Sequence, residues 1–338
     1  MGDDEFLGGA GASDGIGGSN ENGLLASPSN CTNTPALSFE RIYSTEGVNP
    51  LDEIEYNTRD VKIMDREVPG RVIFHEPQAE FPVTWSDTAA KIVADKYFKQ
   101  KPDGTREKSA RDLVYRVAHT IRDAGLRQGV ITGESADIFE AELTSILINQ
   151  RAAFNSPVWF NLGLYDQYGV TAPVKEDDIS YGYNFETGMV EKVADRYQRP
   201  QISACFIDQV EDSVASVADE AKREAMLFKD GSGTGTNFSA LRGRGEPLSG
   251  GGVSSGSVEF MKLGDCVGGV IKSGGKTRRA AKMLILDADH PDVEDFAGWK
   301  AREEKKVAAL GALGYSTSFE GEAYNTVSGQ NANMSVRV

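Results

Sequence analysis

Residues 202–239 read ISACFIDQVEDSVASVADEAKREAMLFKDGSGTGTNFS, and this stretch decides the fold of the second half of the chain. Residues 202–207 are a short apolar run, which predicts a buried strand. Apolar residues then recur every three or four positions over residues 214–228, which predicts a helix. This succession of strand and helix favours an α/β domain with parallel strands.

The same alternation continues downstream. A glycine-rich segment covers residues 231–275, and residues 283–286 are a second short apolar strand. Residues 292–310 are a highly charged predicted helix, and residues 332–338 are a third strand candidate. We therefore expect one α/β domain over residues 154–338.

Upstream, the composition divides the chain twice. Residues 1–36 are rich in Gly, Ser and Asn and poor in aromatic residues, so we expect a disordered tail that cannot bury enough surface to fold. Residues 37–153 begin with an extended stretch at 53–61 and continue with three amphipathic runs. They predict a mainly helical N-terminal domain.

Charge and cysteine content exclude several classes of protein. The 338 residues carry 36 Lys and Arg against 51 Asp and Glu, a net charge of −15, which argues against binding to a nucleic-acid backbone. The chain has neither an apolar run of membrane-spanning length nor a secretory leader, so we expect no membrane partner. Three cysteines are too few for a disulfide framework and indicate a reducing cytoplasm.

The glycines of residues 231–237 (GSGTGTN) could let the backbone approach a ligand closely and expose N–H donors to an anion. The stretch lacks the Gly-Lys-Ser/Thr of a phosphate-binding loop, and Thr236 stands where the third glycine of GxGxxG would be. A plain tight turn is the alternative interpretation.

Residues 272–282 (KSGGKTRRAAK) hold five cations and no acid inside a strongly acidic chain. Arg offers paired donors and Lys a point charge, so a phosphate-bearing ligand is a natural partner for this segment. The alternative is a solvated basic loop that faces acidic neighbours.

The cysteines and histidines give weaker signals. Cys205 lies on the predicted strand, where a cysteine is most often a small core residue, and Cys266 among its glycines is also expected to pack. Cys31 lies in the tail. No two of the three histidines have metal-ligand spacing, so we expect no zinc site. Residues 154–161 (FNSPVWFN) predict an extended bend before the proline, either at a domain junction or at a site.

Taken in order, these segments resemble the N-terminal part of a class II ribonucleotide reductase, the vitamin B12-dependent family. The segments are LSFERIYSTEGVNPLDEIEYNTRDV at 37–61, FNSPVWFN at 154–161, SACFI at 203–207, FKDGSGTGTNFS at 228–239, SGGKTRRAAKM at 273–283, DADHPDVEDF at 287–296 and QNANMSVRV at 330–338. The resemblance covers the chain after its tail. It implies a helical N-terminal domain followed by the first part of a ten-stranded α/β barrel.

The resemblance also implies a reaction. Such enzymes reduce ribonucleotides to 2′-deoxyribonucleotides, and adenosylcobalamin generates a thiyl radical that abstracts the ribose 3′-hydrogen. No metal ligated by the protein is expected in this chain. The implied partners are a ribonucleotide substrate, a deoxynucleotide or ATP effector, a thioredoxin- or glutaredoxin-type reductant and a second copy of the chain in a homodimer.

Site residues follow from the same resemblance. Cys205 matches the first of two cysteines that reduce the 2′-carbon. Ser156, Ala204 and Gly233 match substrate-contacting positions. Asp212, Ser213 and Arg242 resemble the effector-binding positions. Lys276, Arg278 and Arg279 lie in the segment that resembles the loop between effector and substrate.

The chain also departs from the family pattern. The Asn-x-Cys-x-Glu motif of the radical cysteine does not occur, and neither Cys31 nor Cys266 can replace it. We therefore expect no turnover from this chain alone. A non-catalytic nucleotide-binding module remains an alternative, as does a class I reductase with a separate radical subunit. The sequence leaves the substrate's phosphate number, the cobalamin contacts and the role of residues 163–200 open.

Overall fold

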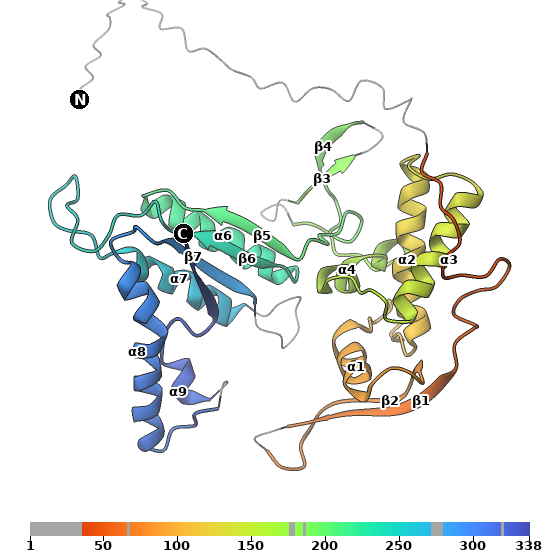
Figure 1. Cartoon of the computed structure of the whole chain (residues 1–338), viewed down its shortest axis with the longest axis horizontal. Helices are drawn as coiled ribbons and strands as arrows, with labels where there is room; N and C mark the ends of the chain where they lie inside the picture. Colours follow the sequence, from red (N-terminus) through yellow and green to blue (C-terminus); the bar gives the residue numbers. More distant parts are fainter. Residues whose placement is uncertain (1–35, 66–67, 176–179, 185–186, 272–279, 319–320) are drawn as a thin grey trace, which may run out of the picture.

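The computed structural model describes residues 36–338 apart from 66–67, 176–179, 185–186, 272–279 and 319–320. Two lobes follow one another along the chain, drawn in red to yellow and in green to blue in Figure 1. Each lobe has its own buried apolar core, one built around Phe81 and Val114 and the other around Leu284 and Phe296. The predicted tail lies outside the described residues except for Ala36.

The N-terminal lobe packs a β-hairpin against helices. Strands β1 (Tyr56–Met64) and β2 (Val72–Pro82) pair antiparallel. Helix α1 (Asp87–Ile92) continues into a single π-helical turn, η1 (Val93–Tyr97), before α2 (Ala110–Arg127) and α3 (Glu134–Ile148). Helices α1, α2 and α3 lie where the three amphipathic runs of the sequence predicted helices. The expectation of a mainly helical domain missed β2, whose inward residues Ala79 and Phe81 join the core.

Short elements connect the lobes. Helices α4 (Ser156–Asn161) and α5 (Leu164–Tyr168) precede a hairpin of β3 (Tyr181–Asn184) and β4 (Met189–Lys192). The extended bend predicted before Pro157 is confirmed at Asn155, which has φ −67° and ψ 160° and caps α4, whereas Ser156 already belongs to the helix. Pro157 lies in the first turn of α4, where a missing backbone N–H costs no hydrogen bond.

The C-terminal lobe is a four-stranded parallel sheet in the order β5-β6-β7-β8. The strands are β5 (Cys205–Gln209), β6 (Gly233–Asn237), β7 (Lys282–Asp287) and β8 (Ala332–Arg337). Helices α6 (Val214–Lys229), α7 (Ser257–Val270) and α8 (Val293–Ala312) connect successive strands, and the short α9 (Glu322–Asn325) precedes β8. This confirms the α/β prediction. The described residues of this lobe form one sheet of four parallel strands, and the ten-stranded barrel stays a prediction.

Of the glycines in residues 231–237, Gly231 lies in a turn with φ +95°, whereas Gly233 and Gly235 lie on the inner strand β6. A Cβ on Gly233 would lie 2.7 Å from the carbonyl oxygen of Ala281, and one on Gly235 would lie 3.0 Å from Ile207 Cδ1. The close approach that the glycines permit is therefore an approach of neighbouring parts of the chain.

The sheet has a covered face and an open face. Leu284 and Leu286 of β7 are fully buried under the helices, whereas Met283, which precedes Leu284 and points to the opposite face, is 40% exposed. Ile207 of β5 is 78% exposed on the side of Met283. The prediction that residues 202–207 form a buried strand is therefore wrong. β5 is an edge strand of the described sheet, and its Cys205 side is uncovered.

Helix α6 turns a partly polar face inward. Its buried residues are Val217, Glu220, Glu224 and Phe228, whereas Val214, expected on the apolar face, is exposed.

Among the described residues, no helix combines the length and the apolar character that crossing a membrane would require.

Candidate active site

Cys205, Ala204 and Gly233 lie together where the first two strands of the sheet begin. Cys205 opens β5 opposite Gly233, which opens β6, and the Gly233 N–H donates to the carbonyl of Ala204 at 2.6 Å. The Cys205 thiol is free and exposed, so the alternative interpretation of Cys205 as a small core residue is wrong. Cys266 on α7 is also exposed, and the packing role expected for it is wrong too.

A hydrogen-bond network holds the residues just before these two strands. The Ser232 hydroxyl donates to the carbonyl of Ser203 at 2.8 Å, and the Gln201 amide donates to the same oxygen at 2.8 Å. Gln201 also hydrogen-bonds to the Ser203 N–H and the Ser232 hydroxyl. The loops leading into β5 and β6 are thereby tied to each other.

The last residue of α4 reaches this network from the other lobe. The side-chain amide of Asn161 donates to the carbonyl of Gln201 at 2.8 Å and to that of Asp230 at 3.0 Å. Ser156 lies at the opposite end of α4, with its hydroxyl 3.1 Å from the Tyr97 hydroxyl. The structure therefore connects the helix of Ser156 to the strand of Cys205 through Asn161.

A buried ion pair holds the C-terminal end of α4. Arg116 of α2 and Glu107 are both fully buried, and Arg116 Nε donates to Glu107 Oε1 at 2.8 Å. The guanidinium also donates to the carbonyls of Trp159, at 3.1 Å, and Leu162. A cation there complements the negative end of the helix dipole. The signal that the sequence analysis missed is an arginine on the apolar face of α2.

The three residues expected at an effector site are brought together. Ser213 caps α6, its hydroxyl accepting from Ser216 N–H at 3.1 Å. Arg242 follows β6, and its Nε donates to the Asp212 carboxylate at 2.7 Å while Nη2 lies 2.6 Å from the same carboxylate as an ion pair. The hydrogen bond from Arg242 lowers the pKa of Asp212 below its ordinary value.

The basic segment is only partly described. Lys276, Arg278 and Arg279 lie outside the described residues. Its last cation, Lys282, is not in a solvated loop: it is buried on β7, with its ammonium against the Glu224 carboxylate. Thr234 and Thr236 donate to the same carboxylate at 2.9 and 2.8 Å. Lys282 therefore packs the sheet against α6.

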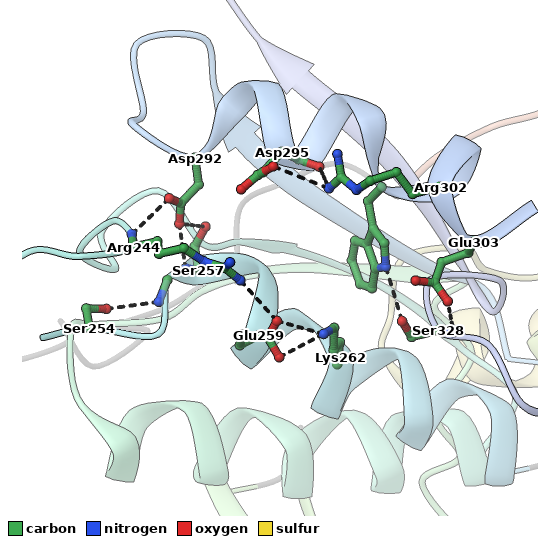
Figure 2. A network of polar contacts seen from close by, with 12 residues as sticks. Arg244, Ser254, Ser257, Glu259, Lys262, Asp292, Asp295, Arg302, Glu303 and Ser328 are labelled. Carbon is green, nitrogen blue, oxygen red and sulfur yellow. Dashed lines mark hydrogen bonds and ion pairs between the residues drawn. The ribbon is translucent and has the colours of Figure 1, made fainter. Parts of the chain in front are cut away.

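A further network, which the sequence analysis did not anticipate, fixes the loop after Arg242 (Figure 2). The Asp292 carboxylate accepts from the Arg244 N–H at 2.9 Å and from the Ser257 N–H and hydroxyl at 2.7 and 2.9 Å. Burial alone would raise the pKa of Asp292, but these hydrogen bonds lower it below its ordinary value. Because Asp292 precedes α8 and Ser257 begins α7, the carboxylate joins three segments.

Two cavities accompany these groups. One of about 180 Å³ lies beside the Asp292 network and is lined by Arg244, Glu259, Lys262 and Trp299 among others. A larger one of about 910 Å³ lies beside Asn161 and is bounded by α2, the β3 segment and the residues before β5. Its lining includes six cations, namely Lys99, Arg127, Lys175, Arg196, Arg199 and Lys229, and two acids, Asp166 and Asp230. The described lining is thus cationic within an acidic chain.

Comparison with known proteins decides the family. The family described as class II vitamin B12-dependent ribonucleotide reductase matches residues 58–150, and the ribonucleotide reductase barrel domain matches residues 203–338. This chain belongs to the class II ribonucleotide reductases. The resemblance inferred from the motifs is confirmed, and the match at residues 58–150 favours class II over class I.

Individual class II relatives agree. The chain is 43% identical to a vitamin B12-dependent ribonucleotide reductase of Rhodopirellula baltica over 306 residues, which are 89% of this chain and 29% of that protein. Its identity to the Streptomyces avermitilis protein of the same name is 44% over 310 residues, which are 91% of this chain and 29% of that protein. The chain thus spans less than a third of the length of these class II reductases.

Proposed function

We propose that this chain supplies the substrate- and effector-binding part of an enzyme that reduces ribonucleotides to 2′-deoxyribonucleotides. The observation that carries the proposal is the exposed Cys205 thiol beside Gly233, at the start of two adjacent strands. A thiol that reduces a sugar must be accessible and must have a partner with which to form a disulfide. An exposed cysteine on an edge strand meets the first requirement.

The chemistry assigned to Cys205 balances with a second thiol from the remainder of the enzyme. The ribose 2′-hydroxyl leaves as water, and the two thiols supply two electrons and two protons and become a disulfide. A thioredoxin- or glutaredoxin-type dithiol then reduces that disulfide by exchange, a cycle that belongs in a reducing cytoplasm. Ser156, Ala204 and Gly233 are proposed to contact the substrate nucleotide.

Adenosylcobalamin, the cofactor implied by the family, would supply the initiating radical through homolysis of its cobalt–carbon bond. Among the described residues, no three His, Cys, Asp or Glu side chains are grouped so that they could hold a metal ion. No cobalamin contact is assigned to these residues.

Effector recognition is proposed at Asp212, Ser213 and Arg242, with a deoxynucleotide or ATP as ligand. The N-terminus of α6 favours an anion, and Arg242 can pair with a phosphate. Asp212 is proposed to accept a hydrogen bond from a ribose hydroxyl. Lys276, Arg278 and Arg279 are proposed to relay effector binding to the substrate.

Two assembly proposals complete this function. Val214 on α6 and Leu263 and Val270 on α7 are exposed apolar residues on two neighbouring helices, which supports a homodimer through this pair of helices. The open face and the edge strands of the four-stranded sheet support its extension into a ten-stranded barrel.

The deciding experiment replaces Cys205 by Ser in the full-length enzyme, with adenosylcobalamin and an external dithiol. We expect turnover to be abolished while nucleotide affinity is retained, the pattern of a lost chemical step. In the 338-residue chain, a maleimide should label Cys205, and bound substrate should slow that labelling. Full turnover of Cys205→Ser would refute the reductive role, and nucleotide binding without any turnover of the unaltered enzyme would favour a non-catalytic module.

A further inference from the structure

The side chain of Asn161 links the two lobes at the point where the Cys205 strand begins. Its two amide hydrogens go to two different carbonyls, that of Gln201 at 2.8 Å and that of Asp230 at 3.0 Å. An asparagine amide has two donors, so Asn161 Nδ2 is fully used by these bonds. Gln201 and Asp230 are far apart in sequence, and one amide holds both.

The two acceptors precede the two strands that carry the proposed site. Gln201 lies in the segment that leads into Cys205, and Asp230 ends α6 just before Gly233. Beyond them, the N–H of Gly233 donates to the carbonyl of Ala204 at 2.6 Å, the contact that sets Cys205 beside Gly233. A shift of either segment would therefore displace the thiol relative to Gly233.

Asn161 itself is held from the N-terminal lobe. Arg116 donates to the carbonyls of Trp159 and Leu162, on either side of Asn161, and is fixed by Glu107. Both charged groups are fully buried, so the pair cannot rearrange without exposing an unpaired charge to an apolar core. The position of the Asn161 amide is thus set by α2.

Gly163 allows this close packing. It adopts φ +77°, and a Cβ there would lie 2.7 Å from Arg116 Cγ and 2.5 Å from the Thr120 hydroxyl oxygen. That hydroxyl donates to the carbonyl of Arg116 at 2.7 Å. The chain can therefore turn directly after α4 while Arg116 reaches the end of the helix.

We propose that Asn161 is a positioning residue that sets the Cys205 thiol against Gly233, and that the N-terminal lobe holds it there through Arg116. What Cys205 does once positioned rests on the proposed function. The positioning of the thiol by Asn161 does not rest on the proposed function. The positioning and the reaction can therefore be tested separately.

Replacements of Asn161 separate the effect of its two hydrogen bonds from the effect of its side-chain volume. Asn161→Asp keeps the size but offers two acceptor oxygens to two carbonyl oxygens, so both hydrogen bonds become repulsive contacts. Asn161→Ser is smaller and retains a single donor, and it serves where the Asp variant does not fold. Asn149→Ala is the matched control, because the Asn149 amide donates to the carbonyl of Ser145 at the end of α3, within the N-terminal lobe.

The first readout is the alkylation of cysteines in the 338-residue chain, with the labelled peptides separated and quantified by mass spectrometry. Cys266 serves as an internal reference, because it is a second exposed thiol and lies on α7, whereas Asn161 lies on α4. We expect either Asn161 variant to change the ratio of the Cys205 rate to the Cys266 rate, and Asn149→Ala to leave it unchanged. A role confined to general stability would move the two rates together.

The second readout is amide hydrogen exchange at Gly233, whose N–H reports the bond to Ala204. We expect exchange on the order of tenfold faster in the Asn161 variants, which corresponds to the loss of about one hydrogen bond. Unchanged exchange at Gly233 together with an unchanged thiol ratio in a folded Asn161 variant would overturn the proposal. Neither measurement requires turnover, so a failure here is distinguishable from a failure of the Cys205→Ser test.

Discussion

The guanidinium of Arg242 forms an ion pair with the Asp212 carboxylate, in which Nε donates to Oδ2 at 2.7 Å and Nη2 lies 2.6 Å from the same oxygen. This pair joins the end of β6 to the segment before α6, two parts of the chain that the sequence analysis had grouped only by resemblance. An effector that binds here has to exchange its own hydroxyl and phosphate groups for this ion pair. The affinity for the effector is therefore a difference between two sets of charged hydrogen bonds.

Replacing Arg242 by Ala should weaken deoxynucleotide binding by about 1–3 kcal/mol, since it removes a charged donor to the phosphates. Isothermal titration calorimetry on the chain measures this. Arg337→Ala is a suitable control, because Arg337 forms a similar exposed pair with Asp287 at 2.6 Å on the far edge of the sheet. An affinity indifferent to Arg242→Ala would remove this residue from the effector site.

The double replacement of Arg278 and Arg279 by Ala should weaken nucleotide binding by about 1–3 kcal/mol for each charged hydrogen bond lost. The midpoint of thermal unfolding should stay nearly constant, because the sequence predicts a loop at these residues and charges on a loop add little stability. Calorimetric titration combined with a thermal melt separates the two effects. Unaltered affinity in the double variant would exclude the segment from the site.

Breaking the buried pair by Arg116→Met should cost about 3–5 kcal/mol of unfolding free energy, because Glu107 is left charged in an apolar core. Removing both charges, in Arg116→Met with Glu107→Gln, should recover part of that loss. Tyr168 and the Lys99 N–H, each 2.8 Å from a Glu107 oxygen, keep the double variant from full recovery. Denaturant unfolding of Arg116→Met, Glu107→Gln and the double variant measures the coupling energy between the two residues. A loss of unfolding free energy in the double variant equal to the sum of the two single losses would contradict the prediction.

Asp292 should make part of the stability dependent on pH. Its pKa is lowered in the folded chain, so its contribution is present above the unfolded value and is lost as pH falls through the lowered folded value. Asp292→Asn should therefore cost about 1–3 kcal/mol at pH 7, and the gap to the unaltered chain should narrow in acid. Urea unfolding at several pH values tests this, and a gap that does not change with pH would contradict it.

The sequence predicted what depends on local patterns. The bounds of α6 to within one residue, the strand at residues 283–286 and the α/β class follow from hydrophobic periodicity and from the order of the elements. Exposure of Cys205 could not be predicted, because an apolar run looks the same on an edge strand as in a buried one. Whether a strand lies at an edge depends on strand order, which no local pattern contains.

The missed contacts have a common physical cause. Arg116 and Lys282 are charged residues whose partners, Glu107 and Glu224, become neighbours only when the helices and strands pack. Similarly, the glycines of β6 look like loop residues until Ala281 and Ile207 are placed against them. The sequence alone could indicate that Arg116 lies on the apolar face of α2, but it could not identify Glu107 as the partner of its charge.

The open face of the four-stranded sheet has a consequence for how the isolated chain behaves in solution. Ile207 and Met283 present apolar surface beside free strand edges, the arrangement by which sheets from different molecules adhere. The net charge of −15 keeps such molecules apart by repulsion. Salt shortens the range of that repulsion to about 10 Å at 0.1 M, so the chain should remain dispersed in dilute buffer and cluster as the salt concentration rises.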